Sequence, residues 1–260
     1  MTAPVRRLAP PRPILVSVGL VAAALVGWLV LLDRMRGMDA GPGTDLGSLG
    51  WFLGIWVTMT AAMMLPAAAP MTVLFSRTSN DEGARTVLFV AGYLLVWTGY
   101  GLGAYAVYRA LRAGAPAFVA WDRQGPYVAG AALGAAGLYE LTPLKSVCLR
   151  HCRSPLHFLL HRWHGGPIGA ARMGAEHGAY CVGCCWGLML ALFALGVMSL
   201  VWMILVTVLI FAEKVLPFGE RLARLLAVAL VLLGVWVAAA PGSVPGLTQP
   251  GSPPIQERTR

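Results

Sequence analysis

The sequence predicts an all-α protein, a polytopic bundle of about seven transmembrane helices, with six as the alternative. Of its 260 residues, 58% are hydrophobic and only 12% are charged, whereas soluble domains carry about 25% charged residues. The mean hydropathy is +0.70. The 31 glycines indicate close helix packing in lipid, because small residues let helix backbones approach.

Each long apolar segment is expected to form one helix, except the segment 179–212, which contains no charged residue. A single helix there would be about 51 Å long at about 1.5 Å per residue, well beyond a hydrocarbon core of about 30 Å. Two helices that break near Gly196 to Ser199 are therefore predicted. The expected helices span 14–32, 49–70, 86–108, 126–141, two parts of 179–212, and 222–240.

The chain divides into three parts. Residues 1–13 form a basic tail, and 14–240 form the transmembrane domain with a Cys/His loop at 142–178. Residues 241–260 are rich in Pro, Gly and Ser and are expected to be disordered. The run 14–32 is longer than the apolar core of a signal peptide, roughly 7–15 residues, so we expect it to be a retained first helix.

The net charge of +9 comes mostly from arginine. In short loops arginine is the usual topology signal. The expected partner is therefore the lipid bilayer and not nucleic acid. Lys and Arg are more frequent in the connections that share a side with the N-terminus. The sequence thus predicts a multi-pass protein of the cytoplasmic membrane with a cytosolic N-terminus. The Cys/His loop then faces the cytosol, where thiols are kept reduced.

All five cysteines fall within a short part of the chain. Cys148 and Cys152 are four residues apart and share a face if the segment is helical. The motif Cys181-x-x-Cys184-Cys185 is expected to open the fifth helix, where backbone amides favour the thiolate, the form that binds metal or attacks disulfides. The alternative is that these thiols simply fill space in the core. An odd number of cysteines argues against a disulfide framework.

Histidines and methionines extend the candidate ligand set. His151 and His177 flank the two cysteine groups, and we interpret both as candidate metal ligands. Met59, Met63 and Met64 lie in the cytosolic half of the second helix, and thioethers are soft ligands that suit Cu(I). Core packing is the alternative for the methionines.

The remaining histidines, His157, His161 and His164, follow Ser154 at helical spacing and end before Gly165. Apolar residues alternate with them, so the segment is expected to be a helix that lies on the membrane surface. We interpret these histidines mainly as its wet face.

Two acidic positions end apolar helices. Glu140 ends the fourth helix, and an ionisable residue near membrane depth is a functional candidate that needs a partner; Lys145 is the one local choice. Glu213 and Lys214 end the sixth helix and are interpreted as an interface anchor.

Helix directions bring these groups to one membrane face. The second and fourth expected helices run toward the cytosol and the fifth runs away from it. We therefore predict one soft-metal site there. Its candidate ligands are Cys148, Cys152, Cys181, Cys184, Cys185, Met59, Met63, Met64, His151 and His177.

Three motifs resemble one known family. They are Met59-x-x-Ala-Met-Met-Leu-Pro66, Tyr139-x-Leu-Thr-Pro-Leu-Lys-x-x-Cys-Leu-x-x-Cys-Arg-x-Pro155 and Cys181-x-Gly-Cys-Cys-Trp-x-Leu-Met189, followed by Glu213-Lys214-x-x-Pro217. In this order they resemble the bacterial integral membrane family known as domain of unknown function 2182, over roughly residues 50 to 240. The resemblance implies a metal-binding membrane protein, with copper as the suspected metal.

The favoured function is binding of Cu(I) at the cytosolic membrane face for delivery or transport, with a metal-donor or metal-acceptor protein as partner. Zinc fits less well, because thioethers add little to a borderline-soft ion. One alternative is a membrane thiol-disulfide oxidoreductase that uses the two cysteine groups. Another is a structural or assembly subunit in which the cysteines only pack. No Walker loop, nucleophile elbow, HExxH or dinucleotide motif occurs, so the sequence does not favour an enzyme.

Overall fold

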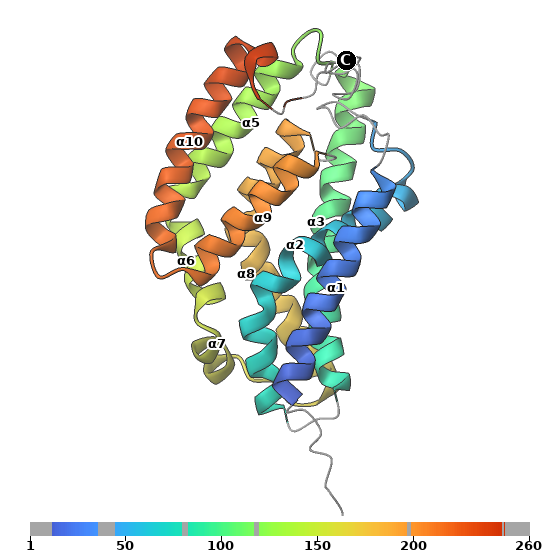
Figure 1. The fold of residues 1–260 in the computed structure, drawn as a ribbon, viewed down its shortest axis with the longest axis vertical. Coiled ribbons are helices and arrows are strands. Elements are labelled where there is room, and N and C mark those ends of the chain that lie inside the picture. Colours follow the sequence, from blue (N-terminus) through green and yellow to red (C-terminus); the bar gives the residue numbers. More distant parts are fainter. Residues whose placement is uncertain are drawn as a thin grey trace, which may run out of the picture.

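The computed structural model describes residues 12–35, 45–79, 83–116, 120–196, 199–245 and 247. Every regular element in this part of the chain is a helix, so the predicted all-α class is confirmed (Figure 1). The helices are α1 (Arg12–Arg34), α2 (Leu49–Thr78), α3 (Ala84–Gly114), α5 (Gly125–Glu140), α6 (Pro143–Arg153), α7 (Pro155–His161), α8 (Gly166–Leu195), α9 (Leu200–Val215), α10 (Gly219–Ala239) and the short 3-10 helix η1 (Pro241–Ser243).

Five helices, α1, α2, α3, α8 and α10, are long and apolar enough to cross a membrane. The helices α5 and α9 are shorter, with 16 residues each. Together these seven correspond to the seven expected helices. Large apolar side chains remain exposed on α9 and α10, such as Val201 at 65% and Leu225 at 68%. Such a surface is compatible with a multi-pass membrane protein, because soluble monomers rarely expose large apolar patches.

The connection 142–178 is not a loop. It contains α6, α7 and the first turns of α8, which begins at Gly166 rather than at Ala179. Pro167 occupies the first turn of α8, where its missing N–H group costs nothing. Arg172 and Glu176 form a salt bridge of 3.1 Å one turn apart, so two charged residues continue the helix instead of ending it. The expected helix start at residue 179 is therefore wrong.

Other boundaries follow the prediction more closely. The break after α8 occurs at Gly196, whose φ of +107° is a conformation that glycine adopts readily. The second expected helix is longer than predicted, because α2 continues past Pro66 and Pro70 to Thr78. Of the tails, residues 1–11 and 248–260 lie outside the described residues. At the start of the C-terminal tail, Pro241–Ser243 forms a short 3-10 helix.

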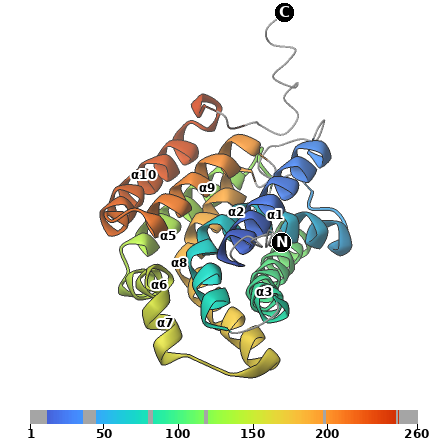
Figure 2. The same cartoon turned by 60° about the horizontal axis from the view of Figure 1, so that its bottom comes forward.

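The helices form three groups. The pair α5 and α10 lies on one side, α1, α2 and α3 lie on the other, and α8 and α9 lie between them (Figures 1 and 2). Glycines permit close contact within these groups. A Cβ atom on Gly130 of α5 would lie 2.5 Å from the Gly234 carbonyl oxygen of α10, and one on Gly92 of α3 would lie 2.1 Å from the Ala171 oxygen of α8. This close packing of α3 on α8 positions the candidate site.

Candidate metal centre

The helix α8 carries three cysteines and one histidine on one face. His177, Cys181, Cys184 and Cys185 follow helical spacing, and the three thiols are fully buried. They lie in the middle of α8. The prediction that this motif opens a helix is therefore wrong. The backbone amides around the motif already donate hydrogen bonds within the helix, so they do not stabilise a thiolate. Stabilisation of a thiolate here has to come from side chains.

The helix α6 brings a fourth thiol to this face. The Cys184 sulfur lies 3.7 Å from the Cys152 sulfur and 3.3 Å from the Cys185 sulfur. The Cys184 thiol also donates to the Cys181 carbonyl oxygen at 3.3 Å. We call Cys152, Cys181, Cys184 and Cys185 the thiol cluster. All are free thiols, and they join two helices that are far apart in the sequence.

Cys148 lies beside the thiol cluster, on the backbone of α8. A Cβ atom on Gly183 would come within 2.6 Å of the Cys148 sulfur, so the absence of a side chain there is what admits this thiol. Burial raises the pKa of Cys148, against the opposing effect of the Lys145 ammonium. The helix α6 contains both Cys148 and Cys152, so the spacing places them on one helix face.

Two polar side chains contact the thiol cluster at Cys181. The Lys214 ammonium nitrogen, near the end of α9, donates to the Cys181 sulfur at 2.9 Å. The Tyr93 hydroxyl of α3 lies 2.9 Å from the same sulfur. Lys214 is only 8% exposed, so the expectation that it is an interface anchor is wrong. An ammonium buried against sulfur stabilises negative charge on that sulfur.

Glu213, the residue before Lys214, links α9 to α6. Lys145 lies 2.6 Å from a Glu140 carboxylate oxygen and 2.8 Å from a Glu213 carboxylate oxygen, and all three side chains are buried. Glu140 thus has the partner that the sequence suggested. Burial lowers the pKa of Lys145, but the two carboxylates outweigh it and raise the pKa above its ordinary value. Consecutive residues of α9 therefore bind α6 through Glu213 and α8 through Lys214.

The two histidine candidates have different surroundings. His177 is 3% exposed, and its ring packs against Phe89, Tyr93 and Phe158 at centroid distances of 5.7 to 6.1 Å. Its Nδ1 atom has no hydrogen-bond partner within the described residues, which leaves it available as a ligand. His151 is half-buried, stacks on Tyr180 at 4.3 Å, and its Nδ1 atom lies 2.9 Å from the Val147 carbonyl oxygen.

The three methionine candidates lie in the core. Met59, Met63 and Met64 are at most 1% exposed and belong to the same buried cluster of side chains as the thiols. The polar contacts of the thiols go instead to each other, to Lys214 and to Tyr93. In the described ranges, no three His, Cys, Asp or Glu side chains already surround one point as a finished metal cage.

The arrangement as a whole can hold a soft cation. Its donors are sulfur atoms, which suit soft and borderline-soft metals such as Cu(I) and zinc. The apolar surroundings exclude water, and Lys214 supplies a positive charge that can balance thiolates. Sequence reasoning missed Lys214 and Tyr93 as parts of this site. The available signal for Lys214 was its charge, because the residue lies in an otherwise apolar segment that precedes Pro217.

Fold and side chains define an all-helical protein in which a buried thiol cluster joins the short helix α6 to α8, a helix long enough to cross a membrane. A family model described as PpoB2, copper chaperone, matches residues 53–237. The chain therefore belongs to the PpoB2 copper chaperone family. The match agrees with the expected metal-binding family, because both indicate copper. The name domain of unknown function 2182 is not confirmed by the match. Neither the curated proteins nor the solved structures contain a match.

Proposed function

We propose that the protein binds Cu(I) as cargo at the thiol cluster and passes it to a partner protein at the cytosolic face of the membrane. One observation carries this proposal. Thiols from α6 and α8 meet in a buried region, with the sulfurs of Cys152 and Cys184 3.7 Å apart, beside the ammonium of Lys214. Membership of a copper chaperone family supports the choice of metal.

The proposed ligands are the four thiols of the cluster. Cys148 is the nearest reserve thiol, and His177 has a free ring nitrogen on the same face of α8. His151, Met59, Met63 and Met64 are proposed as auxiliary ligands during entry or release. The three methionines share the buried cluster of the thiols, and His151 is the neighbour of Cys152 on α6. Thiolates hold Cu(I) without a redox change, so the function proposed is transfer of the ion and not catalysis. Zinc is the less suited metal where the methionines take part, because thioethers add little to a borderline-soft ion.

Metal analysis tests this proposal. Protein purified without oxygen and loaded with Cu(I) is expected to retain copper, and Cys181→Ser/Cys184→Ser is expected to lose it. Cys148→Ser serves as the matched control, because its sulfur lies against Gly183 rather than within the cluster, and it should weaken binding less. Equal copper retention by all three proteins would overturn the proposal.

The location is also part of the proposal. We infer a multi-pass protein of the cytoplasmic membrane with its N-terminus and α6 on the cytosolic side. Five helices long enough to span and the distribution of Lys and Arg support it. Reporter fusions at residue 13 and within 154–165 should both report the cytosol. A periplasmic signal at either position would contradict the proposed orientation.

A thiol-disulfide oxidoreductase is the second candidate, and the sulfur separation of 3.7 Å between Cys152 and Cys184 favours it. A disulfide has an S–S bond of about 2.05 Å, so a small shift would join α6 to α8. Redox titration followed by mass spectrometry distinguishes the two functions. A reversible Cys152–Cys184 bond that exchanges with a partner thiol would favour the oxidoreductase over the copper chaperone.

A further inference from the structure

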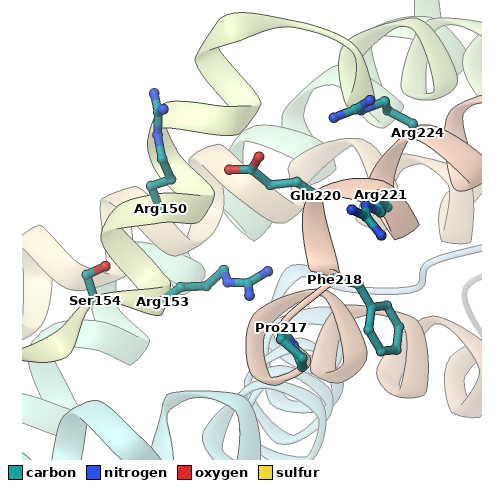
Figure 3. A pocket seen from close by; sticks show the side chains of 8 residues that line it. All are labelled: Arg150, Arg153, Ser154, Pro217, Phe218, Glu220, Arg221 and Arg224. Atoms are coloured by element: carbon teal, nitrogen blue, oxygen red, sulfur yellow. The ribbon is translucent and has the colours of Figure 1, made fainter.

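A cavity of about 650 Å³ lies between α6 and the turn that joins α9 to α10. Four arginines line it, Arg150 and Arg153 from α6 and Arg221 and Arg224 from α10, together with Glu220 (Figure 3). Arg153 extends from α6 toward the turn, and Glu220 extends from α10 back toward α6 (Figure 3). One carboxylate among four guanidinium groups leaves the cavity strongly positive.

Apart from Glu220, no carboxylate from the described part of the chain lines the cavity to balance its positive charge. Among the residues that the structure describes, the ion pairs involve other side chains, and none joins a carboxylate to Arg150, Arg221 or Arg224. Guanidinium groups present paired N–H donors that match the oxygens of phosphate. A concave surface of one charge attracts an ion of the opposite charge.

Two features hold the cavity in shape. Arg153 donates to the Glu213 carbonyl oxygen at 3.0 Å and to the Leu216 oxygen at 2.6 Å. Its guanidinium packs on Gly219, where an added Cβ atom would lie 2.1 Å from Nη1. Arg153 therefore forms a fixed wall, whereas Arg150, Arg221 and Arg224 are exposed and free to close on an anion.

The position along the chain favours a ligand at the membrane surface. The helix α10 begins at Gly219 and is one of the five possible spans, so its first turn lies where a span starts. The residue before it, Phe218, is 49% exposed and gives α10 no side-chain cap. A helix N-terminus favours anions, and basic pockets beside spans are suited to phosphate headgroups.

We propose that this arginine pocket binds a phosphate group, carried either by an anionic phospholipid headgroup or by a free phosphate compound at the membrane surface. The proposal does not depend on copper binding. It does place a ligand next to the site, because Arg153 holds the backbone of Glu213, the neighbour of Lys214. The chemistry required is the same for both carriers, and two separate measurements distinguish them.

The test uses the full chain in nanodiscs of neutral phosphatidylcholine. In one arm inorganic phosphate is titrated by calorimetry. In the other arm phosphatidylglycerol is mixed into the nanodiscs, and the lipid retained after delipidation is measured by mass spectrometry. The pocket variant is Arg150→Gln/Arg224→Gln. The matched control is Arg77→Gln/Arg123→Gln, which removes the same charge from exposed positions outside the cavity.

In at least one arm, the pocket variant should bind roughly thirtyfold more weakly, since each of the two basic residues contributes about 1 kcal/mol near a headgroup, while the control stays close to the wild type. Glu220→Gln removes the opposing charge and should strengthen binding, a gain that misfolding cannot produce. Binding in the lipid arm alone identifies the headgroup as the ligand, and binding in both arms identifies phosphate itself. Absence of binding in both arms, or equal losses in pocket and control variants, would overturn the proposal.

Discussion

Lys214 places an ammonium group against the Cys181 sulfur, at 2.9 Å, in a region closed to water. A Cu(I) ion bound by two thiolates carries a net negative charge, and such a charge is costly to bury without a partner. Lys214 is therefore expected to balance the loaded site. The Tyr93 hydroxyl lies on the same sulfur and adds a polar contact without charge.

The first prediction concerns this charge. Lys214→Met should lower Cu(I) affinity by about tenfold or more, because hydrogen bonds to charged groups contribute roughly 1.5–3 kcal/mol. Competition with a coloured Cu(I) chelator measures the change. Lys214→Arg keeps the charge and should recover most of the affinity. An unchanged affinity in Lys214→Met would remove Lys214 from the site.

The second prediction concerns the buried ion triad of Glu140, Lys145 and Glu213. Lys145→Met leaves two buried carboxylates without a cation, and breaking such a group costs about 3–5 kcal/mol. The unfolding midpoint in a mixed-detergent titration should fall accordingly. Adding Glu140→Gln and Glu213→Gln to this variant should recover stability, because the stranded charges are then absent. No recovery in the triple variant would show that packing, not charge, explains the loss.

Sequence reasoning reached part of this site. Lys145 was the one local partner that the sequence offered to Glu140, and the structure pairs the two at 2.6 Å. The contact between Lys214 and Cys181 could not be predicted, since it depends on how α9 packs on α8. The same holds for Tyr93, which reaches Cys181 only through the close approach of α3 and α8.

At the scale of elements, α8 is the helix on which the site is built. Its 30 residues present His177, Cys181, Cys184 and Cys185 to α6, α9 and α3. The expected start at Ala179 followed from counting apolar residues only. The true start at Gly166 depends on Pro167, which suits a first helical turn, and on the Arg172–Glu176 pair, which favours a helix despite its charge. The break at Gly196 was predictable, because length alone required two helices.

The third prediction concerns the contact between α3 and α8. Gly92→Ala would place a methyl group 2.1 Å from the Ala171 carbonyl oxygen, so the helices must separate, at a cost of about 1–3 kcal/mol. Thermal unfolding in detergent should show the loss. Gly99→Ala lies on the same helix with nothing within 4 Å and should be neutral or slightly stabilising. Equal stabilities in the two variants would contradict the close packing described here.

At the scale of the molecule, the fold gathers distant segments around one buried region. The helices α6 and α7, the start of α8 and the turn between α9 and α10 lie toward the same end of the bundle (Figures 1 and 2). Helix order and class were predictable from hydropathy. The arrangement of the groups was not, since it arises from glycine contacts such as Gly130 with Gly234. The thiol cluster and the arginine pocket share this end, and α9 connects them.

The measurement that tests the central claim most directly is copper K-edge X-ray absorption of the Cu(I)-loaded protein. A site built from the thiol cluster predicts a first shell of sulfur, the spectral signature of Cu(I), and loss of that shell in Cys181→Ser/Cys184→Ser. A first shell dominated by nitrogen or oxygen, or a sulfur shell that survives the double substitution, would contradict a copper site between α6 and α8.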